Sequence, residues 1–310
     1  MFKKSMLLLI ALVLVVASVS AVSFGAKKQV TIGATFMTMN NPFFVAMEKN
    51  IRAELKKIDP SAKLIVADSQ FNLAKQISDV EDMIQQKIDI LLLNAVDSKA
   101  IAPAVVAANK ANIPVITLDV NAEGGKITSF IASDNYLAGK LCGEYLVKRL
   151  KTKGNIVIIN GTPITSVMQR VQGFKDVIAK YPDIKVVAEQ NGETNETKSM
   201  EVMENILQSQ RKIDAVFGIN DPTALGALAA VETAGRQNEM FILGVDAAPN
   251  AVEAIKKGKA LVATSAQFPG EIGRKGVQIA YKVLKGEQVP SEIKVKVELI
   301  TKDNAAGFSW

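Results

Sequence analysis

The sequence predicts an α/β protein with two doubly wound parallel sheets. Short apolar runs rich in β-branched residues recur along the 310 residues, and segments with helical spacing separate most of them. Runs that are apolar throughout indicate strands covered by helices on both faces, which is typical of parallel sheets. Ten such runs are many for one sheet in a chain of this length. We therefore expect two sheets of about five strands each.

The ten strand runs follow one another between residues 30 and 267. Those of the first half are VTIGATF (30–36), KLIVAD (63–68), IDILLLN (88–94), IPVITLD (113–119) and TSFIAS (128–133). Those of the second half are NIVIIN (155–160), IKVVAE (184–189), DAVFGIN (214–220), MFILGVD (240–246) and ALVATSAQ (260–267). Helical faces lie between them, as the spacing of Phe44, Met47, Ile51 and Leu55 shows after the first strand.

The two halves are not separated by a flexible linker. No Gly-, Ser- or Pro-rich stretch divides them, which suggests that the chain passes between two domains more than once. The weakest strand run, TSFIASDN at 128–135, lies in mid-chain and is a candidate for such a crossing.

The first residues predict export. A short basic region, MFKKS, precedes the apolar run MLLLIALVLVVASV, and small residues follow it. This pattern is typical of a secretory signal peptide, here residues 1–26 with cleavage after Ala21 or Ala26. The apolar run is short for a membrane span, and no Cys lies in this region to carry a lipid. We therefore expect a periplasmic protein without a permanent membrane anchor.

Composition excludes several kinds of catalytic and metal site. The chain has no His, which removes Ser-His-Asp and Cys-His catalysis and imidazole metal ligands. Its one cysteine, Cys142, excludes an intrachain disulfide and a thiolate zinc cluster, and we expect a buried, inert thiol. The formal net charge is +6, but the basic residues are scattered among acidic ones. We expect no nucleic-acid partner, no cofactor and no metal.

Polar side chains end four of the predicted strands. They are Asn94, Asp119, Asn220 and Asp246. In open parallel sheets the carboxyl ends of the strands border the ligand crevice, so we expect these side chains to converge there. Carboxylates and amides accept hydrogen bonds, and amides also donate them, which suits a small molecule with many hydroxyl groups.

The same residue types also cap helices, and this alternative stays open at each position. Asp97 and Asp221 directly precede helical segments, so we expect them to be caps. Asn94 and Asn220 precede those caps, which leaves them freer to point at a ligand. Asp119 is followed by VNAEGG rather than by a helix, so capping does not explain it.

The junction TMNNPFF, between the first strand and the first helix, carries more than a turn requires. A capping residue and a Pro at the first helical position would suffice. Asn41 stands at the carboxyl end of the first strand, and Phe44 lies on the apolar face of the helix, as a core residue would. Phe43 lies off that face, so we expect it to reach the crevice, where a flat ring packs against the C–H face of a sugar.

Seven motifs together resemble the ribose-binding group of periplasmic binding proteins, the substrate-binding components of ABC sugar importers. They are NNPFF, LLLNAVDS, ANIPVITLD, IASDN, GINDPTALGAL, GVDAAPNAVEAIKKG and VATSAQFP, in order along the chain after residue 27. The resemblance implies the type I periplasmic binding protein fold, with two lobes joined by three crossings near Ser133, Gln267 and Lys296. The implied lobes are residues 27–133 with 268–296, and residues 134–267 with 297–310.

The resemblance also implies ligand contacts, position by position. They are Asn41, Phe43, Phe44, Asn94, Asp119, Arg170, Asn220, Asp246 and Gln267. Val120 stands where the family's ribose binders carry an arginine, and Thr194 and Val245 stand where they carry aromatic rings. Buried sugar hydroxyls left without partners cost about 1–3 kcal/mol each. We therefore expect a pentose, a polyol or a related monosaccharide other than ribose.

The implied function is sugar capture by a monomeric, non-catalytic receptor that docks on an ABC permease, with a chemoreceptor as a further candidate partner. An enzyme is the second hypothesis, with Asp119 and Asp246 as the acid and base of a glycosidase. Enzymes that bind nucleotides on such sheets carry a glycine-rich phosphate loop after the first strand, and this sequence has no such loop there. A sugar-responsive transcription regulator is the third, but a signal peptide occupies the place of its DNA-binding helices.

Overall fold

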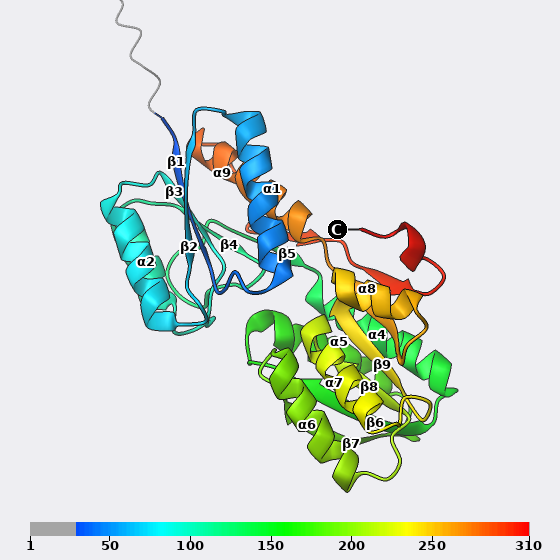
Figure 1. Ribbon diagram of the computed structural model, residues 1–310. Helices are drawn as coiled ribbons and strands as arrows, with labels where there is room; N and C mark the ends of the chain where they lie inside the picture. Colours follow the sequence, from blue (N-terminus) through cyan, green and yellow to red (C-terminus); the bar gives the residue numbers. More distant parts are fainter. Residues whose placement is uncertain (1–28, 310) are drawn as a thin grey trace, which may run out of the picture.

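The computed structural model describes residues 29–309. The predicted signal peptide, residues 1–26, lies outside this range. Within it, no helix combines the length and the apolar character needed to cross a membrane. The described chain forms two lobes, each with a central sheet and covering helices (Figure 1).

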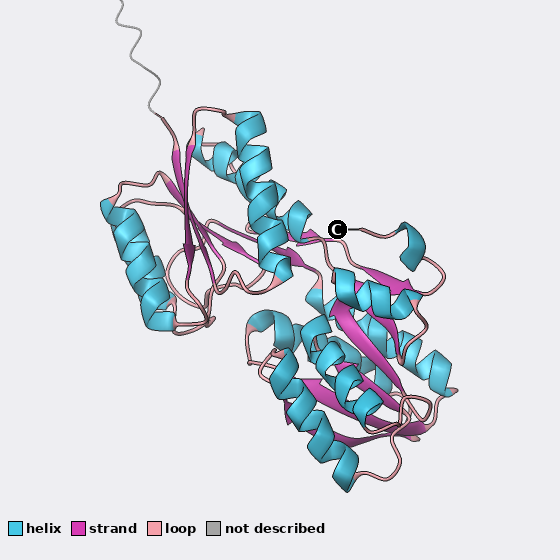
Figure 2. Ribbon diagram, in the orientation of Figure 1, coloured by secondary structure: helices cyan, strands magenta, loops and turns pink. Residues whose placement is uncertain are grey.

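The first lobe is built on a parallel sheet of six strands (Figure 2). In the order β11-β5-β4-β3-β1-β2, the strands are Glu292–Val295, Ser129–Ser133, Val115–Leu118, Ile90–Leu93, Thr31–Phe36 and Lys63–Asp68. Helices α1 (Pro42–Ile58) and α9 (Pro269–Leu284) pack together on one side of this sheet. Helix α2 (Leu73–Gln85) lies on the other side, in contact with α3 (Ala102–Lys110).

The second lobe repeats this plan. In the order β12-β10-β9-β8-β6-β7, its strands are Glu298–Thr301, Leu261–Ala266, Phe241–Asp246, Ala215–Gly218, Gly154–Asn160 and Ile184–Asn191. All neighbours are parallel except β10 and β12. Its helices are α4 (Asn135–Leu150), α5 (Thr165–Ile178), α6 (Glu196–Ser209), α7 (Asp221–Thr233), α8 (Pro249–Lys256) and the short 3-10 helix η1 (Ala305–Gly307).

The chain passes between the lobes three times. β5 leads into α4, β10 leads into α9, and β11 leads into β12 after Lys296 and Val297. The prediction of two doubly wound sheets is confirmed, with six strands in each sheet rather than about five. The pattern missed β11 and β12 because both are four-residue edge strands that are only partly buried.

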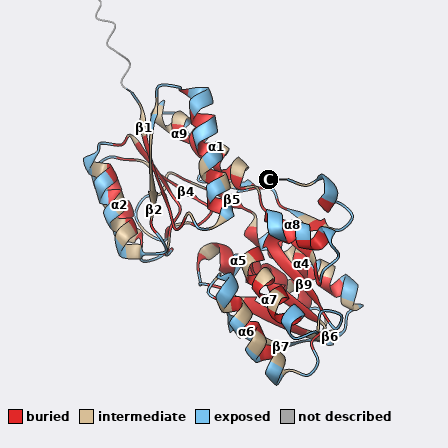
Figure 3. Cartoon of the chain, viewed as in Figure 1, coloured by how far each residue is buried: buried red, intermediate tan, exposed pale blue. Residues whose placement is uncertain are grey.

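Most strand residues and the inward faces of the helices are buried in both lobes (Figure 3), and the larger cluster of buried apolar residues includes members from both lobes. β3, β4, β8 and β9 are buried along their whole length, as expected for parallel strands covered on both faces. Cys142 is buried in α4, where its Sγ donates to the Gly244 carbonyl at 3.3 Å. Burial raises the pKa of this thiol to about 12, so it stays un-ionised at neutral pH.

Helices α4 and α5 approach each other closely at two glycines. A Cβ at Gly139 would overlap the carbonyl oxygen of Arg170, and one at Gly173 would overlap that of Tyr136. Only the absence of a side chain allows the two backbones to come this near. This contact fixes the position from which α5 presents Arg170.

Candidate functional site: a cleft between the lobes

A cleft lies between the two lobes, with about 470 Å³ of space between its walls when the part open to solvent is included. The first lobe contributes Met37, Asn41, Phe43, Phe44, Phe71 and Asp119. The second lobe contributes Ile164, Ser166, Val167, Arg170, Thr194, Asn220 and Asp246, and Gln267 lies at a crossing. The wall is therefore complete only when both lobes are present.

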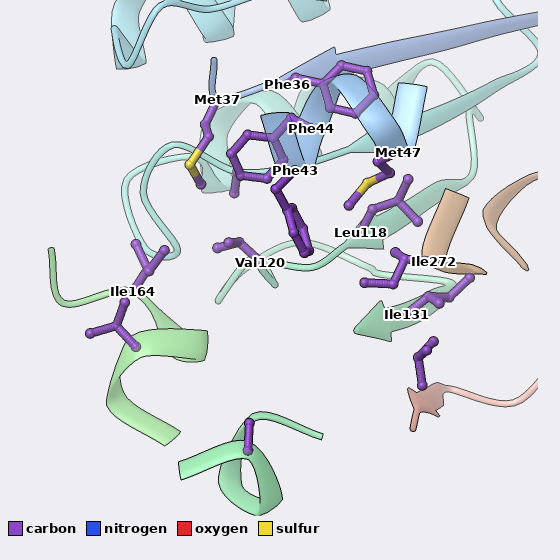
Figure 4. Close-up of a cluster of buried hydrophobic side chains, with 14 of the residues drawn as sticks. Phe36, Met37, Phe43, Phe44, Met47, Leu118, Val120, Ile131, Ile164 and Ile272 are labelled. Atoms are coloured by element: carbon purple, nitrogen blue, oxygen red, sulfur yellow. The ribbon is translucent and has the colours of Figure 1, made fainter. Parts of the chain in front are cut away.

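Two aromatic rings from the start of α1 line the cleft. Asn41 caps this helix, since its Oδ1 accepts a hydrogen bond from the Phe43 backbone N–H at 3.0 Å, and Pro42 follows as the first helical residue. Phe43 and Phe44 meet edge to face, with their ring centroids 5.4 Å apart (Figure 4). Both rings border the cleft, including Phe44, which the helical pattern places on the core face. They offer apolar surface to the C–H groups of a ligand.

Two carboxylates from different lobes share the cleft. Asp119 follows β4 and Asp246 ends β9. Burial raises the pKa of each carboxyl from its ordinary 3.8 to about 6, although Arg170 acts to lower both. Repulsion from Asp246 further raises the pKa of Asp119. No residue in the range 29–309 donates a hydrogen bond to the buried Asp119 Oδ1, and no group of three or more Asp, Glu or Cys there is placed to hold a metal ion.

Both Asp119 and Asp246 have a positive backbone φ angle, which is uncommon for residues other than glycine. The φ angle is +63° at Asp119 and +129° at Asp246. Such conformations cost of order 1–3 kcal/mol in residues other than glycine, and they gather at functional sites. A buried network holds the turn after Asp246, because Asp221 accepts hydrogen bonds from the Ala248 backbone N–H and from Thr264 Oγ1, both at 2.7 Å.

Arg170 supplies the positive charge of the cleft wall. Its Nε donates to Asn135 Oδ1 at 2.7 Å, and its Nη1 donates to the Ile219 carbonyl at 3.2 Å. The same Nη1 lies 3.7 Å from Asp246 Oδ1. These contacts of Nε and Nη1 fix the plane of the guanidinium group.

Gln267 connects a crossing to the acid of the second lobe. Its Nε2 donates to Asp246 Oδ1 at 2.6 Å, and this bond acts to lower the pKa of Asp246 against the effect of burial. Its Oε1 is buried, and no donor in the described part of the chain reaches it.

Comparison with known proteins agrees with this architecture. Residues 32–288 match the periplasmic binding protein domain. The chain belongs to the periplasmic binding protein family. The ribose import binding protein of Salmonella typhimurium is 41% identical over 295 residues, which cover 95% of this chain and 98% of the relative.

Two solved structures resemble this periplasmic binding protein closely. One is an ABC transporter solute binding protein from Bacillus halodurans C-125 with bound myo-inositol, at a TM-score of 0.84 and 30% identity over 90% of this chain and 96% of that one. The other is the fructose-binding periplasmic domain of a hybrid two-component system, at a TM-score of 0.86 and 30% identity over 90% of this chain and 93% of that one. The first of these structures is thus an ABC transporter component and the second is part of a two-component system, whereas the Salmonella relative is named for ribose import.

One predicted contact of this periplasmic binding protein does not lie on the cleft wall. The side chain of Asn94 is buried, where its Oδ1 accepts from the Met37 backbone N–H at 3.1 Å and its Nδ2 donates to the Leu118 carbonyl at 3.0 Å. Asn94 therefore ties together the ends of β1 and β4, next to Asp119, instead of facing the cleft.

The N-cap of α7 is the residue before the one that the sequence predicted. Asn220, rather than Asp221, is the N-cap of α7, since its Oδ1 accepts from the Thr223 backbone N–H at 3.0 Å. The prediction that Asp221 caps this helix is wrong, because its carboxylate is buried in the network beneath Asp246. Asn220 still lines the cleft, and capping occupies only its Oδ1, so its Nδ2 stays available.

The sequence patterns did not point to several wall residues. They are Met37, Phe71, Ile164, Ser166 and Val167. Asn135, which orients Arg170, was also not singled out by the sequence patterns. Asn135 is the last residue of the motif IASDN, and this place in a motif could have identified it. Of the positions that depart from ribose binders, Thr194 lines the cleft, whereas Val120 and Val245 are fully buried and do not.

Proposed function

We propose that this periplasmic binding protein captures a small, hydroxyl-rich molecule, such as a pentose, a polyol or a related monosaccharide, and delivers it to an ABC permease. One observation carries the proposal: Asp119 and Asp246 come from different lobes to one cleft, both buried and both under the influence of Arg170. The relatives are binding proteins, which supports a non-catalytic role.

The ligand contacts follow from polar atoms that the protein leaves unused. Sugar hydroxyls donate to Asp119 Oδ1 and Gln267 Oε1, whose burial without donors is otherwise costly. Arg170 Nη2 donates to a ring or hydroxyl oxygen. Phe43 and Phe44 pack against the C–H face of the same molecule.

Capture involves closure of the two lobes. We assign residues 27–133 with 268–296 to the first lobe, and residues 134–267 with 297–310 to the second. The lobes touch at Thr165, whose Oγ1 accepts from the Asn121 backbone N–H at 3.4 Å and whose own N–H donates to Ser98 Oγ at 3.3 Å. A ligand favours closure only by touching both lobes, and the cleft wall comes from both.

We also propose that the ligand is not ribose itself. Val120 and Val245 are buried and bring neither a cation nor a ring to the cleft, and Thr194 brings only a hydroxyl group. A ligand with fewer or differently placed hydroxyls leaves fewer of them unpaired in such a site. The relation to a ribose import protein makes ribose the reference compound of any test.

The mature protein acts as a periplasmic monomer in this proposal, after removal of residues 1–26. The relation to a periplasmic domain of a two-component system supports a second candidate function, in which the closed form reports the ligand to a sensor or a chemoreceptor.

Calorimetry with a panel of D-ribose, L-arabinose, D-allose, xylitol and myo-inositol tests the proposal, together with native mass spectrometry of the freshly purified protein. We expect submicromolar binding of a panel member other than ribose, or a co-purified polyol or sugar. Binding of ribose alone would defeat the ligand assignment. Turnover of nitrophenyl glycosides would defeat the non-catalytic role.

A further inference from the structure

Phe71 lies where the cleft opens to solvent. It is 55% exposed, more than any other large hydrophobic residue in the range 29–309. It lines the cleft and two neighbouring hollows, and Thr194 of the second lobe lines all three with it. An aromatic ring of the first lobe thus stands at the mouth, opposite the second lobe.

The loop that carries Phe71 is held firmly in a costly conformation. Gln70 and Phe71 both have left-handed backbone, with φ angles of 53° and 56°. Asp68 Oδ1 accepts from the Gln70 backbone N–H at 3.0 Å, and the Phe71 N–H donates to the Met37 carbonyl at 2.6 Å. Left-handed backbone is unfavourable for a bulky side chain. Core packing does not explain it here, because more than half of Phe71 remains exposed.

The second lobe carries a matching loop. Glu193 and Thr194 follow β7 with φ angles of 55° and 56°, and Asn195 caps α6 just as Asn72 caps α2. β2 and β7 are edge strands, and each lies at the edge of its sheet farthest from the strands that lead from one lobe to the other. The two loops therefore meet at the mouth of the cleft, with a ring on one side and a small hydroxyl group on the other.

We propose that Phe71 is a specificity-determining residue that covers the bound molecule, packing its ring on a C–H surface of the ligand at the mouth. Thr194 leaves room for the ring on the opposite side. An aromatic ring gains most from a ligand with a flat apolar face. A ring that covers the mouth of the cleft mainly hinders the bound ligand from leaving, so it changes the dissociation rate more than the association rate. The inference rests on the proposed function, because it requires a sugar or polyol in the cleft.

Three variants test the role of this ring. Phe71→Asn removes the ring and keeps a residue that tolerates left-handed backbone. Phe71→Trp keeps an aromatic face. Val106→Ala trims another exposed apolar side chain, on α3 outside the cleft wall, and is the matched control. Calorimetry with the same five-compound panel gives Kd, displacement kinetics give the dissociation rate, and thermal unfolding without ligand confirms folding.

We expect Phe71→Asn to raise the Kd of the panel compound that wild type binds most tightly by roughly three- to tenfold, through faster dissociation. Phe71→Trp and Val106→Ala should stay within about twofold of wild type. A Phe71→Asn protein that binds every panel compound as wild type does would overturn the inference and leave the proposed function intact. A wild-type protein that binds no panel compound would overturn both.

Discussion

Replacing Asp119 with Asn should stabilise the ligand-free protein while weakening ligand capture. The Asp119 carboxyl is buried, one of its oxygens has no donor within residues 29–309, and its pKa is raised to about 6. The folded protein therefore holds this proton more tightly than the unfolded chain, and ionisation lowers the free energy of unfolding as the pH rises. Asn has nearly the same shape, carries no charge and tolerates the left-handed backbone found here.

The magnitude follows from the pKa of the Asp119 carboxyl. It rises from 3.8 to about 6, and each unit of such a difference corresponds to about 1.4 kcal/mol. At pH 7.5 the charged group thus lowers the free energy of unfolding by about 3 kcal/mol. At pH 4 the group is protonated in the folded protein and partly protonated in the unfolded chain, so the effect falls below about 1 kcal/mol.

Urea unfolding of wild type and Asp119→Asn, without ligand at pH 7.5 and at pH 4, measures this effect. We expect the variant to be more stable by up to about 3 kcal/mol at pH 7.5 and by less than about 1 kcal/mol at pH 4, with panel binding weakened in calorimetry. Asp82→Asn, at an exposed position of α2, is the control and should change neither quantity. An Asp119→Asn protein no more stable than wild type at pH 7.5 would refute the reasoning.

Three further outcomes follow from the cleft. Ligand hydroxyls favour the ionised forms of Asp119 and Asp246, so the Kd should rise by up to about tenfold per pH unit for each carboxyl as the pH falls below about 6. Calorimetry between pH 7.5 and pH 4.5 measures this dependence, and a constant Kd would contradict it. Asn135→Ala should weaken binding by about 1–3 kcal/mol because Arg170 loses its Nε acceptor, and unchanged affinity would exclude that role. Gly139→Ala should lower the free energy of unfolding by about 1–3 kcal/mol through overlap with α5, which denaturant titration checks.

Much of the fold was predictable because it depends on local pattern. Apolar runs and helical spacing locate β1 to β10, and the polar strand ends include Asp119 and Asp246, which the structure brings to one cleft. β11 and β12 were not predictable in this way, since their four residues are stabilised by pairing with β5 and β10 rather than by their own burial.

The sequence pattern does not predict which hydrogen bonds the polar strand ends make. Asn94 and Asn220 follow strands in the same way, yet one bonds the backbone of a neighbouring strand end and the other caps a helix. That choice depends on which backbone groups lie within reach, and residue type does not encode it. Phe71 was missed because it stands three residues beyond the end of β2, where no strand pattern extends.

The position of a strand in its sheet determines how far the residues at its end would move during the lobe closure that we propose. The three crossings leave from one edge of each sheet, so the closure that we propose would take place about a line near β5 and β10. With strands about 4.8 Å apart, Asp119 lies about one strand from that axis and the loop after β2 about four strands. Each 10° of rotation then moves the former by about 1 Å and the latter by more than about 3 Å. Closure would therefore change the surroundings of Asp119 little and would mainly alter the separation of the loops after β2 and β7.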